Sequence, residues 1–185
     1  EPNNLFSDHL LRVSNDEKFG FIDESGSLVI PLQYQFVGNF FNGYCLVMND
    51  DRMWGVIDAE GTLVIPYIYD NAKASFTASG LLAVCKGDKW GLIDQNLNTV
   101  LEPTYDQMEP NASDTDRISV KKNGKYGFVD AAGTLVIPTQ YDEVYSFSGR
   151  TYTRVKVNDK WGIIDKNGEY LLNPNYDSIY SFYDD

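Results

Sequence analysis

Apolar residues recur at alternate positions over a short segment that returns along the chain, as in Leu82 and Val84. A second apolar segment follows after a few polar residues and reads Trp90-Gly91-Leu92-Ile93-Asp94. A period of two predicts β-strands, and Gly87-Asp88 between the segments is typical of a two-residue hairpin turn. Such a turn predicts a register in which Val84 faces Gly91.

The second segment is one of five copies of an aromatic-Gly-apolar-apolar-Asp motif. Its aromatic residues are 35, 36, 36 and 35 residues apart, and each is followed by a tyrosine 15 residues later. The aromatic residues are Phe19, Trp54, Trp90, Tyr126 and Trp161, and the tyrosines are Tyr34, Tyr69, Tyr105, Tyr141 and Tyr176. A fixed period of this length indicates a tandem repeat protein.

Each repeat continues with a turn and a third apolar segment. Asp-x-x-Gly, as in Asp58 to Gly61, favours a type I turn that the aspartate side chain stabilises. The third repeat has Gln95-Asn96-Leu97-Asn98 instead, which predicts an irregular turn. A third strand follows, as in Leu63-Val64-Ile65-Pro66, and its proline predicts the end of the strand ladder or an edge position. The segment after each tyrosine is either a short strand or a single helical turn.

These elements predict an all-β fold of five tandem repeats of about 35 residues, each a β-hairpin plus a third strand. We expect one repeat domain over residues 1–185, with repeats at approximately 9–44, 45–80, 81–116, 117–151 and 152–185. Both faces of each hairpin are apolar, so neighbouring repeats must cover them. The end repeats depart from the pattern at Phe19, Gln35 and Asn173, which favours an open solenoid-like array over the alternative, a closed five-bladed propeller-like ring.

The recurring glycine has a structural interpretation. Glycine inside a strand marks a bulge or a close approach of another group. Because each copy stands beside an aromatic residue, we expect a ring to pack against the bare main chain at Gly91 and its equivalents.

The motif, its period and the trailing Val-Ile-Pro and Tyr-Asp residues resemble the WG-repeat family, which is often met in bacterial proteins. The resemblance covers nearly the whole chain. It implies β-rich repeats with an interaction role, and it supplies no catalytic residue.

Composition and charge narrow the range of partners. The chain has 185 residues and a net charge of −12, which disfavours nucleic acid and anionic membranes. It contains no apolar run of the roughly 20 residues that a membrane-spanning helix needs, so we expect a soluble protein without membrane insertion. The chain begins at Glu1-Pro2 without a methionine, which is compatible with a processed or trimmed protein, and no compartment is assigned.

Candidate chemistry is sparse. His9 is the single histidine, and Cys45 and Cys85 stand at different phases of the repeat. We expect His9 to be exposed and without a functional role, and both cysteines to be buried as small hydrophobic residues. No catalytic triad, metal motif or phosphate-binding loop is recognisable. The sequence therefore predicts a protein that is not an enzyme and has no cofactor, catalytic or metal site.

The leading functional hypothesis is a non-catalytic binding or scaffolding module with protein partners. Variable hairpin positions, such as Arg12, Ala83 and Arg154, are compatible with a binding face.

Two alternatives stay open. A carbohydrate- or cell-wall-binding module would use the out-of-phase Tyr44, Tyr67 and Tyr152, since Trp54, Trp90 and Trp161 are expected in the core. A calcium-stabilised surface protein would use hard oxygen ligands, best at Asp114 and Asp116. Further candidate ligands are Asp50, Asp51, Asp70, Asp106 and Glu109.

Overall fold

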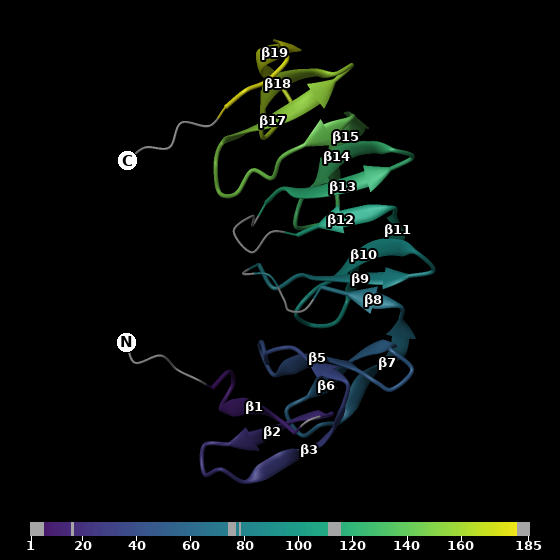
Figure 1. Ribbon diagram of the computed structural model, residues 1–185, viewed down its shortest axis with the longest axis vertical. Coiled ribbons are helices and arrows are strands. Elements are labelled where there is room, and N and C mark those ends of the chain that lie inside the picture. The colour runs from purple at the N-terminus through teal and green to yellow at the C-terminus, as the bar shows by residue number, and fades with distance from the viewer. Residues whose placement is uncertain (1–5, 16, 74–76, 78, 111–115, 181–185) are drawn as a thin grey trace.

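The computed structural model describes residues 6–15, 17–73, 77, 79–110 and 116–180. The described residues form β-strands and turns, with no helix among them. Five antiparallel sheets follow one another along the long axis, from the purple N-terminal sheet to the yellow C-terminal one (Figure 1). The first and last sheets lie at opposite ends, which confirms the open array and excludes the closed ring.

Each sheet is a meander of three long strands, preceded in four cases by a short strand. Sheet 1 contains β1 (Leu10–Ser14), β2 (Phe19–Asp23) and β3 (Leu28–Tyr34). Sheet 2 contains β4 (Phe36–Val37), β5 (Tyr44–Met48), β6 (Trp54–Asp58) and β7 (Leu63–Tyr69). Sheet 3 contains β8 (Asn71–Ala72), β9 (Leu82–Lys86), β10 (Lys89–Ile93) and β11 (Thr99–Tyr105). Sheet 4 contains β12 (Gln107–Glu109), β13 (Ile118–Lys122), β14 (Lys125–Val129) and β15 (Leu135–Tyr141). Sheet 5 contains β16 (Glu143–Val144), β17 (Tyr152–Val157), β18 (Lys160–Asp165) and β19 (Tyr170–Tyr176).

The segment after each tyrosine is a short strand in four cases, which decides between the two sequence-based possibilities. It pairs with the first hairpin strand of the following sheet, as β8 does with β9. The chain therefore passes from the edge strand of one sheet directly to the opposite edge of the next. Hydrogen bonds between consecutive repeats thus add to their packing.

The hairpin register agrees with the sequence prediction in sheets 1, 3, 4 and 5. In sheet 3, for example, Val84 lies opposite Gly91. Sheet 2 differs by one residue, because Val47 rather than Met48 lies opposite Gly55. Its loop has an extra residue and is closed by Met53 N–H, which donates to Asn49 Oδ1 at 2.9 Å. Arg52 takes a positive φ of 61° within this loop, as expected for a turn followed by a bulge.

The third strand does not end at its proline, contrary to one of the two sequence-based possibilities. It lies at the sheet edge, which was the other possibility. It continues as far as the tyrosine, which pairs with the aromatic residue of the motif, as Tyr105 does with Trp90. The strand bulges opposite the glycine, between the pair of Trp90 with Tyr105 and the pair of Leu92 with Leu101. Proline is tolerated at this point because it has no N–H to leave unpaired.

The bulge explains the invariant spacing of the motif glycine. A Cβ added to Gly91 would lie 2.4 Å from the carbonyl oxygen of Leu101 and 2.7 Å from the nitrogen of Pro103. The expected packing of a ring is therefore wrong at Gly91, because main chain of the adjacent strand occupies that space. At Gly55 a ring does approach, since Tyr67 Cδ1 lies 3.1 Å from the place of a Cβ. The equivalent glycines are Gly20, Gly55, Gly127 and Gly162, where the nearest carbonyl oxygen would lie 2.4 to 2.7 Å away.

The Asp-x-x-Gly turns have the predicted role. Asp58 Oδ1 accepts the backbone N–H groups of Glu60 and Thr62 at 3.1 and 2.7 Å. The third repeat is regular despite its sequence, because Asp94 makes the same two bonds and Leu97 adopts the positive φ that glycine takes elsewhere. The prediction of an irregular turn there is wrong.

The core lies between the sheets rather than within them. Sheet 3 turns Leu82, Val84 and Ile93 toward a cluster shared with sheet 2. Its other face turns Ala83 and Leu92 toward sheet 4. Neighbouring repeats thus cover both apolar faces of the hairpin, as predicted. The variable position at Ala83 is fully buried and does not belong to a free binding face.

Candidate functional site

Exposed apolar side chains gather on the edge strands of the sheets. We call this set the edge ridge; its members are Leu28, Val29, Leu63, Val64, Leu135, Tyr170 and Leu171, each between 39 and 62% exposed. They occupy the first residues of β3, β7, β15 and β19, at equivalent places in four of the five sheets. Repetition of the fold therefore exposes apolar side chains at the same place in four of the five sheets.

Acidic turns border the edge ridge, because each ridge residue follows an Asp-containing turn. Asp23 and Glu24 precede Leu28, and Asp58 and Glu60 precede Leu63. The Ser25 hydroxyl and the backbone N–H of Ser27 hold the pKa of Asp23 below its usual value. The turns thus carry negative charge at neutral pH beside an apolar strip.

A cleft opens between sheets 2 and 3, where the edge ridge is interrupted. Its volume is about 160 Å³. Apolar residues from both sheets line it: Ile68, Tyr69, Val84, Ile93, Leu101 and Pro103. Lys86, Thr99 and Glu102 supply its polar lining. Burial first, and the charge of Glu102 second, raise the pKa of Tyr69, which agrees with a carboxylate held close to the cleft.

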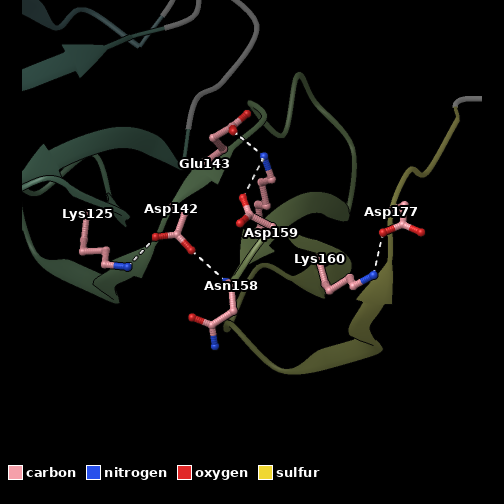
Figure 2. A network of polar contacts seen from close by, with 8 residues as sticks. Lys125, Asp142, Glu143, Asn158, Asp159, Lys160 and Asp177 are labelled. Atoms are coloured by element: carbon pink, nitrogen blue, oxygen red, sulfur yellow. Dashed lines mark hydrogen bonds and ion pairs between the residues drawn. The ribbon is translucent and has the colours of Figure 1, made fainter.

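Several lysines and aspartates at the hairpin-turn end of the sheets form contacts between repeats. Lys125 pairs with Asp142, whose other oxygen accepts the backbone N–H of Asn158 in the next sheet at 2.8 Å (Figure 2). Lys89, Asp106 and Asn123 repeat this arrangement between sheets 3 and 4. The bond to Lys125, together with that from Asn158, keeps the pKa of Asp142 below its usual value.

The acids considered for calcium are mostly occupied. Lysines pair with four of them, and three of these pairs are Lys18 with Asp50, Lys73 with Glu109 at 3.1 Å, and Lys166 with Asp116 at 2.7 Å. Asp106 pairs with Lys89, and Asp70 accepts the N–H of Gly87 at 2.6 Å. Asp51 is exposed, and Asp114 lies outside the described residues. Within the described ranges, no three His, Cys, Asp or Glu residues lie where they could hold a metal ion.

The tyrosines considered for carbohydrate binding lie in different environments. Tyr44 and Tyr67 are half-buried and pack against the inter-sheet clusters. Tyr152 is 47% exposed. Sequence reasoning missed four further exposed tyrosines of the C-terminal region, Tyr145, Tyr170, Tyr176 and Tyr180. Tyr176 gave no signal because its four equivalents are buried.

The remaining candidates behave as small structural or surface residues. Cys45 and Cys85 are buried free thiols. Burial raises the pKa of Cys45 to about 12. His9 is exposed, and its Nδ1 lies 2.8 Å from Glu24 Oε1. Trp54 and Trp90 are half-buried against the inter-sheet clusters.

Among the residues that the structure describes, no helix has the length and apolar character needed to cross a membrane.

Comparison with known proteins supports the repeat assignment. The family model of the WG containing repeat matches residues 19–52, 54–90, 90–126, 126–161 and 161–185. A search of the curated proteins finds no match.

Two solved structures are similar to this chain in fold. A crystal structure of the eukaryotic initiation factor matches 89% of this chain with a TM-score of 0.53 and 13% identity. Kluyveromyces lactis Hsv2 with complete loop 6CD matches 88% with a TM-score of 0.50 and 10% identity. The chain spans only 52% and 58% of those two proteins. At these identities the likeness concerns the fold alone.

Proposed function

The chain belongs to the family of WG containing repeats, and from this premise we propose that it is a non-catalytic module that binds or scaffolds other proteins. The observation that carries the proposal is the edge ridge, which presents apolar side chains at equivalent places in four sheets. Exposed apolar residues at such regular places are typical of an interaction surface. A repeat array provides the extended frame that such a surface requires.

The absence of an enzymatic role is part of the same proposal. The support for it is that the described aspartates mostly bond to lysines or to turn amides, as Asp58 and Asp142 do. Both described cysteines are buried, and burial raises the pKa of Cys45 far above neutral pH. A thiol of that kind is a poor nucleophile.

Cross-linking and capture in an extract of the native host tests the edge ridge. The ridge variant carries Leu28→Ser, Leu135→Ser and Leu171→Ser, at positions that are 44 to 62% exposed, and an unchanged circular dichroism spectrum verifies that it folds. Tyr152→Ser is the matched control, because it removes an exposed apolar side chain outside the ridge. We expect wild type and control to capture the same proteins and the ridge variant to lose them. Equal capture by all three would refute the proposed surface.

Carbohydrate binding is the second candidate function, and the exposed tyrosines of the last repeat favour it. Exposed aromatic rings stack on sugars, and Tyr152 and Tyr176 are each about half exposed. A glycan at 100 times its dissociation constant would stabilise the protein by about 2.7 kcal/mol. Thermal melting with cell-wall fragments tests this: a shift that Tyr152→Ala and Tyr176→Ala abolish would support it, and no shift would exclude it.

A further inference from the structure

Sheet 3 departs from the other repeats at the start of its edge strand. The residue paired with the last apolar residue of the motif is leucine in three repeats: Leu28 opposite Ile22, Leu63 opposite Ile57 and Leu135 opposite Val129. In sheet 3 the same register holds Thr99 opposite Ile93. Threonine is shorter than leucine, so less of the neighbouring surface is covered.

The cleft between sheets 2 and 3 lies at this substitution. In sheet 2 the leucine at this register packs beside the motif glycine, because Leu63 Cδ1 lies 3.1 Å from the place of a Cβ on Gly55. Thr99 lines the cleft together with the buried Val84.

The size of the cleft decides what class of ligand it can take. Pockets for small molecules usually have volumes of roughly 300 to 1,000 Å³, whereas this cleft has about 160 Å³. A cavity of roughly 150 Å³ accommodates a benzene-sized group. The space therefore fits one apolar side chain, such as leucine or phenylalanine, rather than a whole cofactor or sugar.

Charge at the cleft adds a second requirement. Lys86 and Glu102 line it and are exposed, and neither forms an ion pair within the part of the chain that the structure describes. The net charge of −12 favours a basic partner over an acidic one. A lysine or arginine beside the inserted side chain would pair with Glu102, and Lys86 would donate to a backbone carbonyl of the same segment.

We propose that the cleft between sheets 2 and 3 is the anchoring site for a protein segment that inserts one leucine or aromatic side chain beside Thr99 and places a neighbouring basic residue at Glu102. This inference rests on the proposed protein-binding function and assigns its most specific contact. The edge ridge on either side supplies additional, less specific apolar contact.

Selection from a displayed library of random 12-residue peptides on the full chain tests this site. We expect the selected peptides to share an apolar residue near a lysine or arginine. Thr99→Leu restores the residue found at this register in other repeats, so it keeps the fold while filling the cleft. It should reduce binding of these peptides at least tenfold. Thr104→Leu is the matched control, because it adds the same side chain to the same strand outside the cleft lining, and binding should be unchanged.

A second variant tests the contribution of charge without filling the cleft. Glu102→Gln should weaken peptides that carry the basic residue several-fold and leave their neutral analogues unaffected. Equal binding to wild type and Thr99→Leu would overturn the cleft site. If the same peptides were instead lost on the ridge variant, the protein-binding function would stand and only the cleft assignment would fall. No enriched peptide on wild type would also overturn the cleft assignment, and the capture experiment would then decide the proposed function separately.

Discussion

Replacing Gly91 with alanine should destabilise the array by about 3 kcal/mol, because the added carbon would overlap main chain. Overpacking a well-packed region typically costs about 1 to 3 kcal/mol. The upper end applies here, since the Cβ would lie 2.4 Å from the Leu101 carbonyl oxygen and 2.7 Å from the Pro103 nitrogen. No side chain can rotate away to make room. The bulge itself must shift, and the β10–β11 pairs on both sides of it would be strained.

Gly87→Ala is the matched control for this prediction. Gly87 lies in the hairpin turn of the same sheet at a φ of 59°, with nothing within 4 Å of an added Cβ. Alanine there costs only the left-handed conformation, about 1 to 2 kcal/mol. The comparison therefore separates steric overlap from backbone strain.

Urea unfolding followed by circular dichroism and by tryptophan fluorescence measures both losses. Coincidence of the two probes establishes whether the array unfolds in one transition, which repeat proteins do not always do. A loss of about 3 kcal/mol corresponds to a fall in melting temperature of roughly 6 to 12 °C for a chain of this length. If Gly91→Ala costs no more than Gly87→Ala, the close approach at the bulge does not constrain the motif glycine.

Three further outcomes are expected. The pKa of Asp142 in the folded protein lies below its ordinary 3.8, so the bonds of Asp142 stabilise the protein above that pH and are lost as pH falls through the folded pKa. Asp142→Asn should therefore flatten the fall in stability below about pH 4. An unchanged acid-unfolding profile would contradict this. Leu97→Gly should be about 1 kcal/mol more stable than Leu97→Ala in urea unfolding. Both variants lose the packing of the leucine side chain, but only alanine keeps the strain of a Cβ at the positive φ of 66°. The reverse order would show that this strain is unimportant. The thiol of Cys45 should resist alkylation at pH 8 until urea unfolds the chain, since burial raises its pKa to about 12, and rapid labelling of folded protein would refute its burial.

The sequence was sufficient for the features that every repeat shares. The motif aromatic and the tyrosine 15 residues later, such as Trp90 and Tyr105, recur because they face each other on adjacent strands. The turn role of Asp58 followed from local hydrogen bonding alone. Five in-phase copies made such local interpretations secure.

Features that depend on contacts between strands or sheets were harder to predict. The register of sheet 2 depends on a loop in which Arg52 accepts a positive φ, which nothing in its residue type demands. The proline bulge required knowing that main chain, not a ring, approaches Gly91. The cleft arises between two sheets, although Thr99 in place of leucine was visible as a departure from the period.

The third repeat concentrates these departures, and its place in the array gives a reason. Thr99 lines the cleft, Glu102 stands there without an ion pair in the described structure, and Leu97 packs into the cluster below it. Sheet 3 lies in the middle of the array, with two sheets on each side of it (Figure 1). Its packing against sheets 2 and 4 therefore continues to hold its backbone when individual side chains change. Under the proposed protein-binding function, a junction that differs from the others is a source of specificity for a partner. The boundary between sheets 2 and 3 holds the cleft together with the exposed Lys86 and Glu102, so the proposed partner segment would be recognised there by both shape and charge.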